Sequence, residues 1–188
     1  MNTLRKFIEN YTLIPTDEWN EISACFEKQI VEKDEIILKE GTICRHLYFV
    51  ESGLLHFFIN KDGNNITKFF TKAPYFFTSQ SSFNAQKPAT DNIQAIEKSV
   101  VWKISYKRAN DLYTLKSWTI FARKIVQEVQ FFTEEILQEL QTETAESRYK
   151  KMLQNEPELL NRIPLKILAS FLGIAPQSLS RIRKRISP

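Results

Sequence analysis

The sequence predicts an α+β fold in three parts. Residues 29–105 contain short segments rich in β-branched and aromatic side chains, separated by turn residues, which is typical of a sandwich or barrel. Residues 107–145 repeat an apolar side chain every three or four positions and contain neither Gly nor Pro, which predicts one long helix. The remaining segment returns to short helical patterns punctuated by prolines. We therefore expect a β domain with N-terminal helices (1–106), a long helix (107–145) and a small helical domain (146–188).

Composition and cysteine content indicate an ordinary folded chain. Of the 188 residues, 43% are apolar and 26% are charged, which is a globular balance. No apolar run approaches the roughly 20 residues that span a bilayer, and the first residues lack the pattern of a signal peptide. Cys25 and Cys44 are too few for a disulfide framework. The expectation is a cytoplasmic protein without a membrane partner.

The first part combines helices and strands. Residues 1–28 favour helices, since Leu4, Phe7 and Ile8 recur at helical spacing. Asp62-Gly63 is a strong hairpin signal, because these residues adopt the positive φ angles of a tight turn. Six strands are predicted, at residues 35–39, 46–51, 53–60, 65–71, 92–97 and 99–105.

The long helix carries a continuous apolar stripe. A helix of this length exceeds the width of a small domain, so part of the stripe needs another partner. A second copy of the chain would supply it in coiled-coil fashion, which predicts a homodimer. Packing of the stripe against the chain's own β domain is the alternative. The stripe consists of Trp118, Phe121, Ile125, Val129, Phe132, Ile136 and Leu140.

Positive charge is concentrated at the C-terminus. From Ala145 onwards there are nine Lys or Arg and three Asp or Glu, whereas the whole chain has a net charge of +4. A basic end on a near-neutral body favours a polyanion partner, most often a nucleic acid. A solvated basic surface is the alternative reading.

The segment 164–186 has the spacing of a helix-turn-helix. A first amphipathic helix ends at Gly173, which supplies the left-handed conformation of a C-cap. Pro176 suits the first turn of a second helix, because its φ is already helical. Ala169 is small where the two helices must cross closely. The residues expected between the helices are Leu165, Leu168, Leu172, Ile174, Leu179 and Ile182.

The outward face of the second helix fits DNA. Arg bonds guanine through two hydrogen bonds and Gln pairs with adenine, while Ser is less selective. An ordinary helical hairpin with a basic face is the alternative. We expect Gln177, Ser178, Ser180 and Arg181 to contact bases, and Lys166, Arg183, Lys184 and Arg185 to contact phosphates.

Two stretches resemble the Crp/Fnr superfamily of bacterial regulators. The segment Lys39-Glu40-Gly41, followed by residues 47–53, is similar to the family's early β-strand signature, and residues 172–181 are similar to its recognition motif. The resemblance implies an N-terminal β-roll sensor domain of the double-stranded β-helix or jelly-roll type. It also implies a dimerisation helix and a small C-terminal helix-turn-helix domain. The function would be transcription regulation by a homodimer that reads a palindromic DNA site.

The resemblance also locates an effector pocket. Aligned backwards from residues 103–106, the family's phosphate-binding Gly-Glu pair falls on Thr78 and Ser79, and its Arg-Ser pair falls on Ala89 and Thr90. The charge-assisted contact between Arg and phosphate is therefore missing, so cyclic AMP is not the expected effector. An unidentified small effector would bind near Thr78, Ser79, Gln80, Ala89 and Thr90.

Other cofactors and other protein classes are not favoured. Two cysteines cannot ligate an iron–sulfur cluster as four would, and lone histidines in strands are usually structural, so no metal or cofactor is expected. The chain lacks the common catalytic motifs, so an enzyme is not expected. A ligand-binding or interaction module whose helix-turn-helix no longer reads DNA is the alternative. Pro176 supports it, since many family members have a base-reading Arg there.

The resemblance also implies binding partners, and the end of the chain bears on the strength of DNA binding. The expected partners are double-stranded DNA, a second copy and a small effector, and RNA polymerase is left open. The chain ends at Ser187-Pro188, where winged relatives continue into a β-hairpin. We therefore expect no wing, and DNA binding that is weaker and less dependent on salt. The sequence does not determine the operator, or activation against repression.

Overall fold

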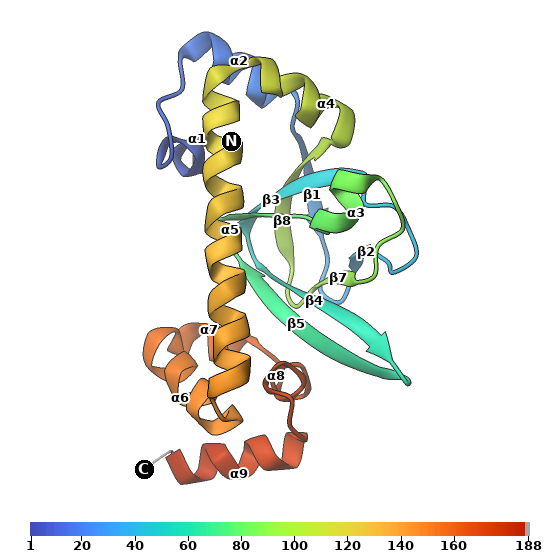
Figure 1. Ribbon diagram of the computed structural model, residues 1–188, viewed down its shortest axis with the longest axis vertical. Coiled ribbons are helices and arrows are strands. Elements are labelled where there is room, and N and C mark those ends of the chain that lie inside the picture. Colours follow the sequence, from blue (N-terminus) through green and yellow to red (C-terminus); the bar gives the residue numbers. More distant parts are fainter. Residues whose placement is uncertain (187–188) are drawn as a thin grey trace.

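The computed structural model describes residues 1–186 and confirms an α+β fold. Ser187 and Pro188, on which the expectation of a missing wing falls, lie outside the described residues. One long helix, α5 (Lys116–Thr142), follows the long axis of the molecule, with the strands to one side of it (Figure 1). The last four helices gather at its C-terminal end (Figure 1).

The β domain consists of two four-stranded antiparallel sheets, in the orders β1-β8-β3-β6 and β2-β7-β4-β5. A short helix, α3 (Gln80–Ala85), follows β6. Apolar side chains fill the space between the sheets, so the domain is a roll with a packed interior. The strands are β1 (Glu27–Val31), β2 (Ile36–Leu38), β3 (His46–Ser52), β4 (Leu54–Lys61), β5 (Asn64–Lys72), β6 (Tyr75–Phe77), β7 (Asn92–Ala95) and β8 (Ser99–Ser105).

All six predicted strands are present, and two further strands were not predicted. The predicted hairpin forms between β4 and β5, with Asp62 and Gly63 at positive φ angles of 52° and 77°. The unpredicted β1 is an edge strand with a mostly polar sequence, in which only Val31 is buried. The other, β6, has three residues, which is too short for alternation to show. Both lie in the same sheet, beside β8 and β3 respectively.

Aromatic side chains hold the roll to the N-terminal helices. Phe7, in α1 (Asn2–Glu9), lies between 5.5 and 5.7 Å from the ring centroids of Tyr11, Phe49, Tyr75 and Phe76. Such tilted and edge-on pairs add to the stability gained by burying the rings. The second helix, α2 (Thr16–Ala24), contributes Ile22 to the same core.

The long helical segment is interrupted, which corrects the prediction of one helix over 107–145. It forms α4 (Tyr106–Asp111), a single 3₁₀ turn (Leu112–Thr114) and then α5. Leu115 is extended, with φ −87° and ψ 130°. The Glu18 carboxylate accepts hydrogen bonds from the backbone N–H of Ser117, at 2.9 Å, and from its hydroxyl. A side chain 99 residues away therefore caps the start of α5, which no local pattern could reveal.

Four short helices form the C-terminal part: α6 (Ala145–Asn155), α7 (Pro157–Arg162), α8 (Leu165–Leu172) and α9 (Pro176–Ile186). Their apolar faces form a second core that also includes Leu54 of β4 and Ile96 after β7. The helical part therefore packs against the β domain. Within residues 1–186, no helix combines the length and apolar character needed to cross a membrane.

Candidate nucleic-acid interface and effector loop

The turn between α8 and α9 has the geometry that the sequence predicted. Gly173 adopts φ 73° and ψ 26°, and its N–H donates to the carbonyl of Ser170 at 3.1 Å. The N–H of Ile174 donates to the carbonyl of Ala169 at 3.0 Å, so the free carbonyls at the end of α8 are satisfied. Ala169 is 1% exposed and Leu179 is fully buried, as expected for the contact between two closely crossing helices.

The residues predicted to contact bases lie on α9, but they differ in exposure. Gln177, Ser178 and Arg181 are exposed. Ser180 is only half-buried, and its hydroxyl donates to the carbonyl of Pro176 at 3.1 Å within the same helix. Three of the four residues therefore form a continuous outward polar face, while the fourth bonds to its own backbone.

The residues predicted to contact phosphates separate into two groups. Lys166 and Lys184 are exposed. Arg185 is exposed as well, but its Nη2 bonds Glu146 Oε2 of α6 at 2.6 Å. Arg183 lies with its guanidinium 5.8 Å from the ring centroid of Tyr149, and its buried Nε has no hydrogen-bond partner in the described structure. The phosphate contact of Arg183 stays a prediction, with a side chain that packs partly on the helical core.

Two of the predicted effector residues, Thr78 and Ser79, bond to other groups of the protein. The Ser79 hydroxyl donates to Asp91 Oδ1 at 2.7 Å, and Ser79 and Ala89 are each 3% exposed. The Thr78 hydroxyl donates to the carbonyl of His46 at 3.0 Å. Gln80 and Thr90 are exposed. All five residues belong to one loop, residues 78–91. The buried ones among them contact other parts of the protein and do not line an open pocket.

Asp91 and Lys68 are polar partners that sequence reasoning missed. Asp91 Oδ2 lies 3.3 Å from Lys68 Nζ of β5, so the carboxylate bridges the loop and the second sheet. The side chain of Asp91 is 8% exposed, whereas that of Lys68 is 41% exposed. The position next to Thr90 was the available signal, but an isolated Asp after a turn is common.

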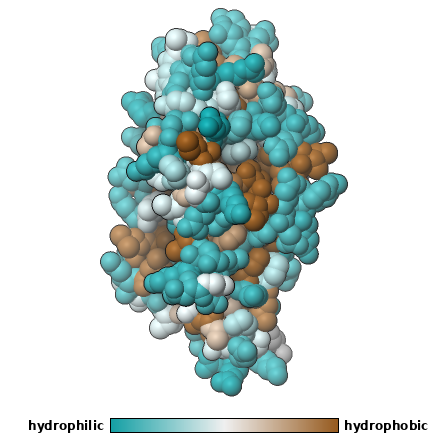
Figure 2. Space-filling model, turned by 90° about the vertical axis from the view of Figure 1, so that its right-hand side faces the viewer, coloured by the Kyte–Doolittle hydropathy of each residue, from teal (hydrophilic) through white to brown (hydrophobic). Residues whose placement is uncertain are grey.

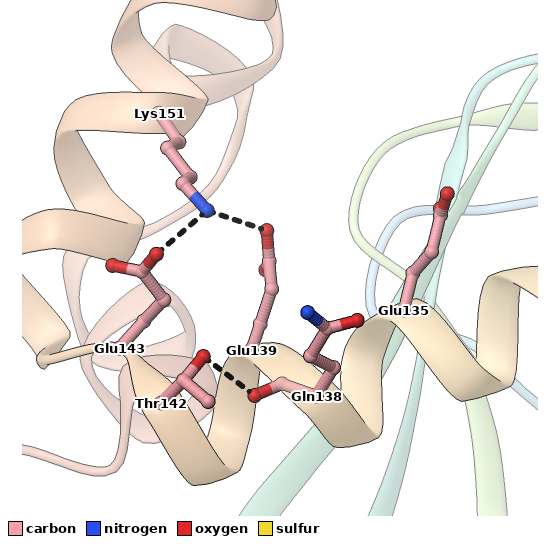
Figure 3. Close-up of a pocket in the computed structure, with 6 residues that line it drawn as sticks. All are labelled: Glu135, Gln138, Glu139, Thr142, Glu143 and Lys151. Atoms are coloured by element: carbon pink, nitrogen blue, oxygen red, sulfur yellow. Dashed lines mark hydrogen bonds and ion pairs between the residues drawn. The ribbon is translucent and has the colours of Figure 1, made fainter.

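Two hollows of the surface are lined by residues outside the 78–91 loop. One, of about 330 Å³, lies where α5 meets α6, and Figure 3 shows Lys151 reaching across it to two carboxylates of the last turns of α5. Its Nζ is 3.4 Å from Glu139 Oε1 and 3.0 Å from Glu143 Oε1. The other, of about 480 Å³, is lined by Phe58 and three asparagines, together with Ile36, Lys39 and Glu40. The ion pairs of Lys151 in the first hollow connect α6 to the end of α5 across the turn between these helices.

The apolar stripe of α5 divides into a covered and an uncovered half. Trp118 and Phe121 are 2% and 1% exposed and pack into the chain's own core, which corrects their assignment to a dimer contact. Beyond them the stripe leaves the β domain. Ile125, Val129 and Ile136 are half-buried, and Phe132 and Leu140 are 49% and 55% exposed. Packing against the chain's own β domain, one of the two alternatives weighed from the sequence, therefore applies to the first half of the stripe, whereas the second half is uncovered within one chain.

Within residues 1–186, no three His, Cys, Asp or Glu side chains are grouped so that they could hold a metal ion. Both histidines lie in strands. His56 is buried between Thr67 Oγ1, at 3.3 Å from Nδ1, and Gln94 Oε1, at 3.1 Å from Nε2. Burial lowers the pKa of His56 below its usual 6.5. Its ring is thus held by neutral hydrogen-bond partners.

Most of the β domain matches one known protein family. Residues 28–115 match the family described as "Cyclic nucleotide-binding domain". The matched segment spans the strands, the 78–91 loop and the turn before α5. No curated protein matches the chain.

Solved structures match most of the chain. A transcriptional regulator of the Crp/Fnr family from Eubacterium rectale matches with a TM-score of 0.73 and 18% identity, over 92% of this chain and 83% of that one. FixK2 from Bradyrhizobium japonicum gives 0.72 and 15%, over 86% and 84%. The catabolite activator protein of Thermus thermophilus gives 0.57 and 17%, over 93% and 84%. Residues 28–115 are therefore similar to the cyclic nucleotide-binding domain family, and the chain has the fold seen in Crp/Fnr transcription regulators.

Proposed function

We propose that this chain is a transcription regulator that reads double-stranded DNA through α9. The outward polar face of α9 carries the proposal: Gln177, Ser178 and Arg181 are exposed beside one another on a helix held by the turn at Gly173. Their side chains have the donors and acceptors that read base edges in the major groove. Exposed Lys166 and Lys184 flank this face and would contact phosphates.

We further propose that the reader is a homodimer joined along α5. The helix has 27 residues, so it is about 40 Å long, and its second half keeps apolar side chains in contact with solvent. Pairing of two such helices would bury Phe132 and Leu140. The β-strand side of the molecule, in contrast, shows hydrophobic groups in separate patches (Figure 2). A two-fold dimer would present two α9 helices to successive major grooves of a palindromic site.

The effector of this regulator is proposed to be something other than cyclic AMP. The 78–91 loop has Ala89 at the aligned position of the family's phosphate-binding Arg, and it contains the carboxylate of Asp91. That carboxylate is paired with Lys68, so this pair leaves no cation of its own for a phosphate. A small neutral effector at the loop stays part of the proposal. RNA polymerase is a proposed partner on the basis of the function alone.

One observation favours the alternative of an interaction module that no longer reads DNA. Two of the four cations predicted to contact phosphates are already engaged within the chain, Arg183 by Tyr149 and Arg185 by Glu146. A helix that had lost its DNA partner would retain such internal contacts only. The exposed side chains of Gln177 and Arg181 favour DNA reading, because neither contributes to the helical core.

A selection experiment tests the proposal. Full-length protein is mixed with random duplex fragments at two salt concentrations, and the retained fragments are sequenced. We expect a palindrome whose half-sites are about one helical turn apart. Arg181→Ala is expected to relax one position of each half-site, at a cost of about 1–3 kcal/mol. Arg123→Ala, which removes an exposed Arg from α5, is the matched control.

The salt dependence separates the two candidates. Lys184→Ala should weaken binding to all sequences alike and should reduce the slope of log affinity against log salt by about one. Weak retention without sequence enrichment, and with no response to salt, would exclude DNA reading and favour the interaction module.

A further inference from the structure

The outer edge of β5 is covered by a single side chain of α8. β5 is the last strand of its sheet, so some of its backbone groups point away from β4 without a strand partner. Ser170 Oγ accepts a hydrogen bond from the Thr67 N–H at 2.9 Å and donates one to the Asn65 carbonyl at 2.7 Å. A hydroxyl can do both at once, so Ser170 replaces one residue of a neighbouring strand.

Apolar contacts extend this junction on both sides of Ser170. The rings of Phe171 and Phe70 lie 5.0 Å apart, which joins the end of α8 to β5. Arg148 of α6 lies 5.1 Å from the Phe171 ring and donates from Nη2 to the Phe171 carbonyl at 3.2 Å. Leu54 and Ile96 of the β domain belong to the same buried cluster as the helix-turn-helix core. The junction is therefore packed as well as hydrogen-bonded.

Ion pairs lie at the rim of the same junction. Arg162, at the end of α7, bonds Glu97 through two contacts, Nη2 to Oε1 at 2.6 Å and Nε to Oε2 at 3.2 Å. Lys72, at the end of β5, pairs with Glu156 before α7. These side chains are 36–53% exposed, so each pair fixes orientation more than it adds stability.

The junction leaves the proposed reading face free. It uses Ser170 and Phe171 of α8 and Arg162 of α7, whereas Gln177 and Arg181 on α9 stay exposed. Figure 1 shows α9 beyond α8, on the side away from the strands. Docking of α8 on β5 is thus compatible with contact between α9 and DNA.

We propose that docking of α8 on the free edge of β5, through Ser170, sets the position of α9 within each protomer. The β domain would then reach the recognition helix directly through β5, in addition to the covalent path through α5 and α6. Ser170 is a positioning residue in this scheme, since it contacts no DNA. The inference rests on the proposed DNA binding. Loss of docking leaves α9 free to reorient, so DNA must then order it at an entropic cost.

The first test uses full-length Ser170→Ala, with Ser23→Ala in α2 as the matched control. The Ser23 hydroxyl bonds only within its own helix, to the carbonyl of Asn20. Alanine favours helix, so α8 itself is not weakened. Without DNA, hydrogen exchange of residues 64–72 should become faster in Ser170→Ala alone, because the Thr67 N–H loses its acceptor. Affinity for the selected operator should fall roughly three- to tenfold.

A charge exchange provides the second test. Arg162→Glu and Glu97→Arg should each weaken operator binding, and the double variant should restore it, because the pair is rebuilt with reversed sign. The control exchanges Glu32 and Lys98, an exposed pair at 2.7 Å that lies within the β domain. Each single control variant and the double control variant should leave operator binding unchanged.

The outcomes of these experiments test the docking of α8 and the proposed DNA binding separately. Unchanged exchange in Ser170→Ala would overturn the inference, and so would tighter operator binding, since docking would then restrain the reader. Failure of the double exchange to restore binding would also count against it. If the unaltered protein bound no duplex, the proposed function would fall, while the exchange experiment would still decide whether Ser170 docks α8.

Discussion

Ser79 and Asp91 are joined by a 2.7 Å hydrogen bond at the two ends of the 78–91 loop. Both residues are nearly fully buried, and the second oxygen of Asp91 faces Lys68. The loop is thus closed by a carboxylate of the chain itself.

Removing that carboxylate should destabilise the β domain. In Asp91→Ala, Ser79 would keep a buried hydroxyl without its acceptor, at an expected cost of about 1–3 kcal/mol in the free energy of unfolding. Urea unfolding followed by circular dichroism measures it. Asp111→Ala is the control, because Asp111 is exposed at the end of α4. Equal midpoints for the two variants would contradict the closure of the loop by Asp91.

Cyclic AMP should neither bind nor stabilise the protein. The loop lacks an Arg to pair with the phosphate, and its buried carboxylate already pairs with Lys68. Titration calorimetry at millimolar nucleotide is expected to show only heat of dilution, and the melting temperature should stay constant. A saturable signal with a matching rise in melting temperature would refute this expectation.

The protein should lose stability as the pH falls below about 6.5. Burial lowers the pKa of His56 below the value of 6.5 that the unfolded chain retains. Between these two values the unfolded state binds more protons, so stability rises with pH and is lost on acidification. Asp34 opposes the effect by favouring the charged ring. His46 shifts in the same direction, again through burial.

His56→Gln isolates the contribution of that residue. The amide can keep a hydrogen bond to Thr67 or Gln94 but does not titrate. Urea midpoints measured between pH 5 and 8 should therefore vary less in this variant than in the unaltered protein. An identical pH dependence in both proteins would assign the acid sensitivity to other groups.

The uncovered half of α5 should control the oligomeric state. Phe132→Glu places a charge in the proposed seam and should convert a dimer into a monomer, as measured by sedimentation velocity. Phe131→Glu is a matched control. Phe131 is 65% exposed, but it is offset by about 100° around the helix and lies off the stripe. Dissociation of both variants, or of neither, would argue against a seam along this stripe.

Local patterns were sufficient for the elements that depend on neighbouring residues. The turn at Gly173, the small Ala169 and the buried Leu179 follow from spacing within about ten residues, and the structure has all three. The hairpin at Asp62-Gly63 is equally local. In these cases backbone conformation and helical periodicity alone select the geometry.

Contacts between segments that are distant in the chain could not be predicted from the sequence. Periodicity showed the stripe of α5 but not that Trp118 and Phe121 lie inside the β domain, since that depends on where the roll ends. The bond between Ser170 and β5 joins residues 103 and 105 positions apart. A serine on a mostly apolar helix gives no sign of which backbone it meets.

The covered edge of β5 has a consequence for solubility. A bare strand edge is a template on which the strand of another molecule can add, and it leads to aggregation. Ser170 and the helix that carries it occupy that edge while α8 is docked. Any condition that swings the helical part away would expose a strand that includes Phe69 and Phe70. The contact that is proposed to orient the last helix therefore also shields this strand edge from edge-to-edge aggregation, and loss of that contact should first become visible as precipitation on storage.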